Sequence, residues 1–289
     1  MDGIFGKFAG EASNWITVFD TPFYPDTLDA AITTYAPVVE EFDELCREAR
    51  DSVDLYRRIQ SSPRHSRIQL LRVFRKYVSP DTSVEMLKRV SKTEQTVSAW
   101  SRRFRPLPEV LSRIANRPQP DEALIAMLDE HGSRGEKGYD LTEAFFLWFE
   151  TEFADANWSI AGPIRAGRDI DLREALPNYP KKTPVDFVLK DPDDEPRVIG
   201  FARYDTDRGG SQEDDRIGGN ERRLREILAF AEANSMDLKV IFLSDGPGLT
   251  LGSMWVDNAT IEEGGKGRAL VTTLKMAQAG RISIDWLES

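Results

Sequence analysis

The sequence predicts a protein of mixed α and β structure, in which a helical N-terminal portion precedes a core of helices flanking a central mixed β-sheet. Two patterns predict this fold class. Up to about residue 131, apolar side chains recur at three- and four-residue spacing, which is the helical period. The rest of the chain holds short runs rich in Val, Ile and Phe around one long amphipathic segment, which is typical of strands packed with a helix. We therefore divide the 289 residues into portions 1–131 and 132–289.

The composition excludes several classes of protein. No apolar run approaches the roughly 20 residues of a membrane span, and the N-terminus lacks the apolar stretch of a secretory signal. The single cysteine, Cys46, excludes internal disulfides, and two histidines argue against zinc catalysis. The glycine patterns that cradle nucleotide phosphates are absent. We therefore expect a cytoplasmic protein with no membrane partner and no nucleotide cofactor.

The N-terminal portion divides into a series of amphipathic segments. Apolar periodicity predicts one long helical stretch over residues 25–60, with Asp26 or Thr27 as its N-cap, and shorter helices over 66–78, 83–90, 91–104, 106–118 and 120–132. Short helices joined by tight turns permit a helix-turn-helix arrangement without requiring one. The portion is therefore predicted to be a small helical bundle.

The charge of this portion is uneven. The formal net charge of the chain is −11, yet residues 56–118 hold fifteen basic residues against four acidic ones, a local charge of +11. A charged ligand responds to the field where it docks, so the local excess outweighs the average. Arg102, Arg103 and Arg105 are the candidates for contact with DNA phosphates. The alternative is a set of solvated helix faces whose charge is balanced by acids elsewhere in the fold.

The C-terminal portion begins with a glycine loop and a helix. Asp140 is expected to cap this helix, with Glu143 at the third following position, and apolar residues all round predict that it is buried up to residue 153. Strands are predicted over residues 158–167, 184–191, 197–205, 237–246 and 281–287, with a helix over 220–235. The expected order is therefore helix, three strands, helix and two further strands.

Two neighbouring strands supply acidic residues. Asp186 stands near the start of the second strand, after Pro184, and the third strand leads through Arg203 to Asp205 and Asp207. Because side chains alternate along a strand, Arg203 and Asp205 are expected on one face. Carboxylates that hold Mg²⁺, with a cation beside them, are the groups that phosphodiester hydrolysis needs. The sequence therefore indicates a metal site on these strands.

Four segments, "YDLTEAFFLWFE", "GPIRAGRDI", "TPVDFVL" and "VIGFARYDTD", resemble in order and spacing the PD-(D/E)xK nuclease superfamily, and in particular type II restriction endonucleases. The resemblance covers roughly residues 132–287. It implies a restriction-endonuclease-like core and a Mg²⁺-dependent, sequence-specific double-stranded DNA endonuclease of a restriction–modification system. Such enzymes usually act as homodimers, since two antiparallel strands are cut.

The chain departs from the family pattern in one place. Gly200-Phe201-Ala202-Arg203 stands where an acid-x-lysine is expected. Arg203 supplies a fixed positive charge but cannot act as a general base, because its pKa stays above about 12. The missing acid is Asp205 or Asp207, or comes from the following segment "QEDDR", which contains Glu213, Asp214 and Asp215. The catalytic candidates are Asp186, Arg203, Asp205 and Glu213, and the candidate Mg²⁺ ligands are Asp186, Asp205 and Asp207.

Further arginines are candidates for contact with DNA. Arg165 and Arg168 lie in the glycine-containing segment "GPIRAGRDI", and Arg208 follows the acidic strand. Each candidate has a structural alternative, such as Asp205 pairing with Arg208 or Glu213 serving as a helix N-cap. Two other functions also remain open, namely a non-catalytic DNA-binding or regulatory protein on a decayed nuclease core, and a DNA repair nuclease.

Overall fold

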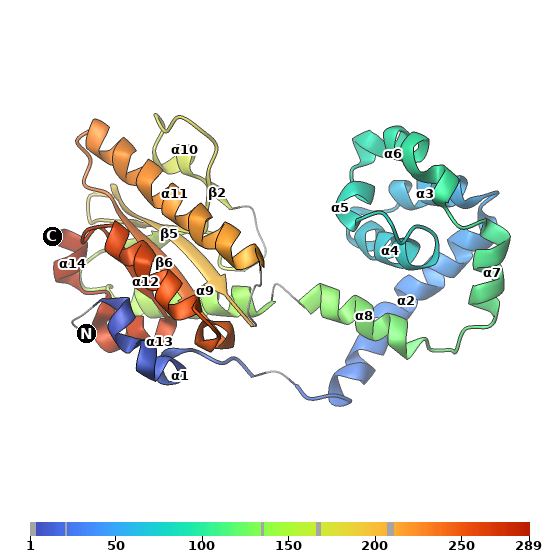
Figure 1. The fold of residues 1–289 in the computed structure, drawn as a ribbon, viewed down its shortest axis with the longest axis horizontal. Coiled ribbons are helices and arrows are strands. Elements are labelled where there is room, and N and C mark those ends of the chain that lie inside the picture. The colour runs from blue at the N-terminus through green and yellow to red at the C-terminus, as the bar shows by residue number, and fades with distance from the viewer. Residues whose placement is uncertain (1–3, 21, 134–135, 166–168, 207–210) are drawn as a thin grey trace. The chain divides into compact units, whose positions relative to one another are not determined.

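The computed structural model describes residues 4–20, 22–133, 136–165, 169–206 and 211–289, with the backbone alone at 131–133, 136 and 211–216. The chain forms two compact units (Figure 1). The sheet unit comprises residues 1–20 and 135–289, and the helical unit comprises residues 21–134. This division differs from the expected one at the N-terminus, because the first 20 residues belong to the sheet unit.

The helical unit is a bundle around one long helix. That helix, α2, packs against α3, α4, α7 and α8. The shared core contains Phe42, Leu55 and Phe74, all fully buried. Cys46 also lies in this core, where burial raises the pKa of its thiol to about 12. The helices are α2 (Asp26–Glu48), α3 (Ser52–Ser61), α4 (Arg64–Tyr77), α5 (Val84–Leu87), α6 (Thr93–Trp100), α7 (Leu107–Ala115) and α8 (Glu122–Ser133).

The long helix expected over residues 25–60 is two helices. The carboxylate of Asp51 accepts hydrogen bonds from the backbone N–H groups of Val53 and Asp54, at 2.8 Å each, and so caps α3. A capping carboxylate of this kind begins a new helix, because it satisfies N–H groups that the first turn leaves unpaired. The N-cap of α2 is Pro25, without a side-chain cap, so the caps expected at Asp26 and Thr27 are wrong.

The sheet unit is built on a five-stranded mixed sheet in the order β1-β4-β5-β6-β7. The pairs β1–β4 and β4–β5 are antiparallel, whereas β5–β6 and β6–β7 are parallel. The prediction of a mixed sheet with flanking helices is confirmed. The strands are β1 (Ser159–Ala161), β4 (Phe187–Lys190), β5 (Pro196–Tyr204), β6 (Lys239–Asp245) and β7 (Ala269–Thr272), and β2 (Ile170–Asp171) pairs separately with β3 (Pro184–Val185).

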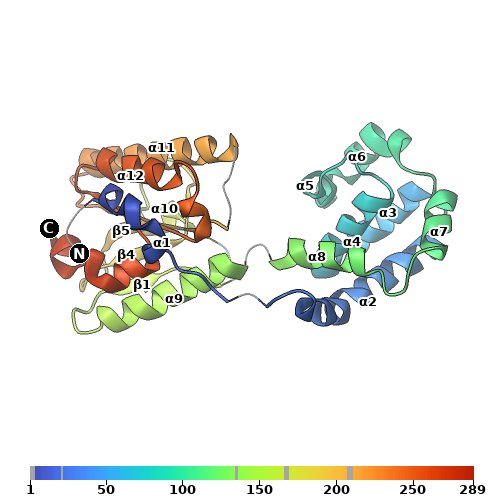
Figure 2. The same ribbon diagram turned by 60° about the horizontal axis from the view of Figure 1, so that its bottom comes forward.

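Helices cover both faces of this sheet. Figure 2 shows α9 (Glu136–Glu152) on one side of the strands and α11 (Ser211–Ala233) and α12 (Met254–Gly264) on the other. Phe145 and Phe149 of α9 pack on Phe187, whereas Leu224 and Ile227 of α11 pack on the opposite face. The short helices α10 (Leu172–Ala175), α13 (Leu274–Met276) and α14 (Ile284–Glu288) complete the unit. In the described part of the chain, every helix is too short or too polar to cross a membrane.

Three local predictions are wrong. The strand expected over residues 281–287 is mostly the helix α14, which Ser283 caps by accepting a hydrogen bond from the N–H of Trp286. The fifth strand is instead β7, a fully buried run of four residues that shows no alternation of apolar and polar side chains. Asp140 does not cap α9, because that helix already begins at Glu136. Short apolar runs do not distinguish strands from buried helices, which explains the first two errors.

The N-terminal segment is part of the core of the sheet unit. It forms a 3₁₀ helix, Phe5–Glu11, followed by α1 (Ala12–Trp15). The ring of Phe5 stacks on Trp255 with centroids 4.2 Å apart, and the Trp255 indole donates a hydrogen bond to the Phe5 carbonyl. Asp245, at the end of β6, accepts a hydrogen bond from the N–H of Thr17. These contacts explain why residues 1–20 belong with a sheet that is distant in sequence.

Candidate functional site

Asp186 lies at the junction of β3 and β4, where two neighbouring strands hold it. Its N–H donates to the carbonyl of Gly200 at 3.0 Å, and its Oδ2 accepts from the N–H of Ala202 at 2.9 Å. The side chain is half-buried, and burial raises the pKa of its carboxyl above the ordinary value, opposed by the hydrogen bond from Ala202. The nearby negative charge of Asp169 raises this pKa further. The strands therefore hold the Asp186 carboxylate where its surroundings only partly offset the cost of burying its negative charge.

Asp186 faces two cavities. The first, of about 260 Å³, is bounded by α9 and the segment after β1, and its polar lining includes Arg165, Asp169 and Arg203. The second, of about 320 Å³, lies beneath α11 and is lined in part by Arg222 and Arg203. Asp186 and Arg203 belong to both cavities. Acidic and basic groups thus converge from the sheet, from α11 and from the segment between β1 and β2.

Arg203 and Asp205 form an ion pair at the end of β5. The Nε of Arg203 lies 2.7 Å from Oδ1 of Asp205, whose side chain is only 7% exposed, whereas that of Arg203 is 43% exposed. The N–H of Asp205 donates to the carbonyl of Asp245. Asp205 is not among the described residues that line either cavity beside Asp186. Asp205 therefore orients Arg203, and its carboxylate is turned to that arginine rather than to the Asp186 cavities.

Phe201 stands where the family pattern places an acid. With Arg203 in the place of the lysine, the acid of an acid-x-lysine motif falls at residue 201. The ring of Phe201 is buried and stacks on Phe242, with centroids 5.4 Å apart. An aromatic ring therefore occupies the position of that acid.

Arg165 is held by two acids of α9. Its guanidinium forms an ion pair with Asp140 at 2.9 Å and a second with Glu143. The side chain is exposed and lines the first cavity. Arg165, for which the sequence predicts a DNA contact, is therefore paired with acids of α9.

Sequence reasoning missed three residues of this region. Asp169 lines the first cavity with Asp186, and Arg222 and Arg223 line the second from α11. The guanidinium of Arg223 lies over the ring of Phe201 at 5.3 Å, which fixes its position. The adjacent arginines of the amphipathic segment that follows the acidic strand were the signal that could have found Arg222 and Arg223.

Other expected site residues lie outside the described residues. These are Arg168, Asp207 and Arg208. Glu213 lies in the first turn of α11, and its side chain is likewise outside the described part, as are those of Asp214 and Asp215. Among the side chains that the structure does describe, no three His, Cys, Asp or Glu residues cluster closely enough to hold a metal ion.

The basic residues expected to bind DNA phosphates lie in the helical unit. Arg102, Arg103 and Arg105 are all exposed. Arg103 forms an ion pair with Asp81 at 2.8 Å, and its guanidinium lies over the ring of Trp100. Arg58 pairs with Glu48 and Asp54, and Arg117 pairs with Asp43 and Asp121, all of which are acids outside residues 56–118. Part of the local charge excess is therefore balanced within the unit, as the structural alternative expected.

Comparisons with models of protein families, with curated proteins and with solved structures found no match to this chain.

Proposed function

We propose that the protein is a Mg²⁺-dependent, sequence-specific double-stranded DNA endonuclease. The observation that carries the proposal is Asp186, a strand-held carboxylate that faces two cavities with Arg203 beside it. The element order supports it as well, because α9, β1, β4, β5, α11 and β6 follow the helix, three strands, helix and strand expected of the nuclease core. The expected homodimer and the restriction–modification context are parts of the same proposal.

The donor set fits a Mg²⁺ ion. Mg²⁺ is usually bound by one or two carboxylates together with water and substrate phosphate oxygens, so a cage of three protein acids is not required. Asp186 and Asp169 line one cavity, and the charge of Asp169 raises the pKa of Asp186, which a cation between them would reverse. These two residues would hold the ion. Bound there, Mg²⁺ would activate water and neutralise charge on the phosphate.

The arginines contribute binding and orientation. Arg203 pairs with Asp205 through Nε and lines both cavities, and a guanidinium matches phosphate geometry. Arg222 and Arg223 line the α11 side of the same space. They would bind the phosphate and offset the negative charge that develops on it during in-line displacement. Arg203 stays protonated and takes no proton from water.

The experiment is a cleavage assay on plasmid and phage DNA with Mg²⁺ or with EDTA. Discrete fragments that EDTA abolishes support the proposal, whereas a smear indicates a non-specific nuclease such as a repair enzyme. Asp186→Asn keeps an acceptor for the Ala202 N–H and is expected to abolish cleavage while DNA binding persists. Asp193→Asn is the matched control, because it removes an exposed acid from the β4–β5 hairpin and should leave cleavage unchanged. Full cleavage by Asp186→Asn would refute the site.

Phe201 favours a second candidate function. A phenylalanine stands at the acid position of the family pattern, and Asp205, the carboxylate that follows β5, forms an ion pair with Arg203. Both features agree with a nuclease core that has lost catalysis and serves as a DNA-binding or regulatory protein. Retained DNA binding without cleavage, at any divalent metal tested, would favour this function over the first.

A further inference from the structure

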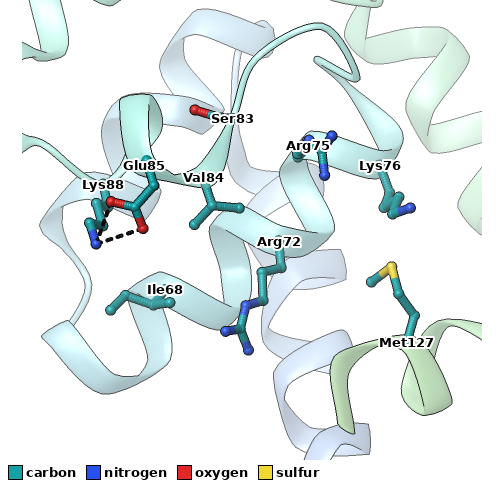
Figure 3. A pocket seen from close by; sticks show the side chains of 9 residues that line it. All are labelled: Ile68, Arg72, Arg75, Lys76, Ser83, Val84, Glu85, Lys88 and Met127. Carbon is teal, nitrogen blue, oxygen red and sulfur yellow. Dashed lines mark hydrogen bonds and ion pairs between the residues drawn. The ribbon is translucent and has the colours of Figure 1, made fainter. Parts of the chain in front are cut away.

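The helical unit contains a cavity of about 530 Å³ beside α4 and α5 (Figure 3). We call it the α4–α5 pocket. Its volume falls within the roughly 300–1,000 Å³ of small-molecule sites. Arg72, Arg75 and Lys76 line it from α4, and Lys88 lines it from the end of α5. The i, i+3 and i+4 spacing of the first three residues puts them on one face of the helix. The cations are therefore gathered by helix geometry rather than scattered.

Acidic groups compensate this charge only in part. The one carboxylate among the described lining residues is Glu85, and it pairs with Lys88 at 2.7 Å. Arg72 donates a hydrogen bond to Gln69, a neutral side chain. Arg75 is half-buried, its Nε has no hydrogen-bond acceptor, and within the described residues it forms no ion pair. Binding of an anion to a partly desolvated guanidinium that lacks a counter-charge is therefore favourable.

The remaining lining is apolar except for Ser83. Ile68 lies one turn before Arg72 on α4, Val84 comes from α5, and Met127 approaches from α8. Figure 3 shows the Arg72 side chain extending between Ile68 and Met127. A small inorganic anion would contact the cations alone and leave the apolar lining exposed to water. A phosphate ester that carries a sugar and a base would use both parts of the pocket.

We propose that the α4–α5 pocket binds one nucleotide of a DNA strand. The phosphate contacts Arg72, Arg75 and Lys76, and the sugar and base lie on Ile68, Val84 and Met127. The identity of the strand as DNA rests on the function proposed above, but cleavage does not enter the inference. A free nucleotide offers the same chemistry, so the experiment separates the two sources.

The test measures binding of fluorescent single-stranded DNA, whose bases are free to enter the pocket, to the full chain in EDTA over a range of salt concentrations. Removing one phosphate-binding cation lowers the slope of log K against log salt by about 0.7 for single-stranded DNA. Lys76→Gln and Arg72→Gln are each expected to lower the slope by about that amount. Arg113→Gln is the matched control, because Arg113 is an exposed arginine of α7 outside the pocket lining, and its slope should equal that of the wild type. Thermal unfolding checks that each variant is folded, and Lys76 is exposed, so its variant tests the pocket even if Arg72→Gln is unstable.

Wild-type slopes in both pocket variants would overturn the inference, and so would an equal decrease in Arg113→Gln. A second arm measures thermal stabilisation by a deoxynucleoside 5′-monophosphate and by inorganic phosphate. Stabilisation by the free nucleotide that is abolished in Lys76→Gln, while DNA binding is unchanged, would reject the strand as the source. A reduced slope in a protein that never cleaves DNA would refute the proposed endonuclease and leave the inference standing. Cleavage combined with wild-type slopes in the pocket variants would support the proposed endonuclease and overturn the inference about the pocket.

Discussion

The two candidate sites of this protein arrange charge in opposite ways. Around Asp186, acids and cations alternate, and Arg203 and Arg165 are each held by a carboxylate. Among the described residues that line the α4–α5 pocket, four are cations and one is an acid, and apolar side chains lie beside them. Alternating charges orient one another and suit a reaction that must position a cation, a phosphate and water. A cluster of positive charges attracts an anion but does not position other groups for a reaction with it. The difference teaches that a formal charge of −11 says little about where DNA would bind.

The two units also differ in how they satisfy a buried ion pair. In the sheet unit, Glu262 pairs with Arg281 and also accepts hydrogen bonds from the N–H groups of Phe5 and Val271. In the helical unit, Arg117 pairs with Asp43 at 2.7 Å, and Oδ1 of Asp43 is buried without a hydrogen-bond partner. Burial raises the pKa of the Asp43 carboxyl, against the effect of Arg117. Glu262 also links the pair in the sheet unit to the distant N-terminal segment through the Phe5 N–H, and this pair is the better satisfied of the two.

The largest expected effect comes from breaking the ion pair of Glu262 with Arg281. Glu262→Ala leaves Arg281 buried without its counter-charge, since the Arg281 side chain is only 1% exposed, and removes the acceptor of the Phe5 N–H. We expect a decrease of about 3–5 kcal/mol in the free energy of unfolding of the sheet unit. Hydrogen exchange resolved by residue should report reduced protection in the sheet unit, with residues 21–134 still protected.

The control for this prediction is the double variant Glu262→Leu with Arg281→Met. Replacing both charges by apolar groups of similar size removes the unpaired ion, so the double variant should recover much of the stability. Equal destabilisation in both variants would mean that the backbone hydrogen bonds of Glu262, rather than its ion pair, hold the segment. Reduced protection throughout residues 21–134 would contradict the separation of the two units.

The sequence predicted the larger features of this fold correctly for identifiable reasons. The long apolar stripe of α9 and the runs that form β5 and β6 carry a strong periodicity, so the order of helix, three strands and helix was predictable. The strand β7 was missed because four buried residues carry no alternation. The membership of Phe5 in the sheet unit was not predictable, since it depends on stacking with Trp255 across 250 positions. Pairing between such distant residues leaves no local pattern.

The candidate site was predictable only where one residue type stood out. Asp186 follows Pro184 in a strand, and Arg203 ends the neighbouring strand, so both drew attention. Asp169 lies near Asp186 only because β2 pairs with β3 and brings its preceding residue to the same cavity. The turning of Asp205 toward Arg203 depends on side-chain conformation, which no spacing encodes. Strand pairing in the tertiary structure and side-chain rotamers therefore limit how much of the site the sequence alone can predict.

The second prediction concerns the cation of the alternating site. Arg203→Met should lower the rate of DNA cleavage by about 10²-fold, because it removes one charged donor to the phosphate. Arg203→Lys keeps a positive charge but not the planar fork, so it should retain part of the rate. Cleavage rates under single-turnover conditions and DNA affinity in EDTA are the measurements. If Arg203→Met weakened binding as much as cleavage, Arg203 would act like the cations of the α4–α5 pocket, and the contrast between the sites would fail.

The third prediction tests the close packing of Gly200 in β5 against the ring of Phe187 in β4. In Gly200→Ala, the new methyl group meets the ring of Phe187 at about 2.1 Å, so the ring or the strand must move. We expect a decrease of about 1–3 kcal/mol in the free energy of unfolding, measured by urea denaturation. Gly10→Ala is a matched control, because nothing lies within 4 Å of a Cβ at Gly10. Equal stability of Gly200→Ala and the wild type would show that position 200 has room for a larger side chain.

The smallest effect is a change in stability with pH at Asp186. Its pKa in the folded protein is raised above the ordinary 3.8, mainly by burial, so above pH 3.8 the folded state keeps a proton that the unfolded state releases. The contribution of Asp186 to stability therefore falls as the pH rises from 3.8 through the raised pKa, and its full cost is present at neutral pH. Asp186→Asn carries no such cost and retains an acceptor for Ala202. Urea denaturation at several pH values should find the variant more stable than the wild type at neutral pH, with the difference vanishing in acid. A variant less stable at neutral pH would mean that the carboxylate serves the fold, whereas higher stability combined with abolished cleavage would assign it to chemistry.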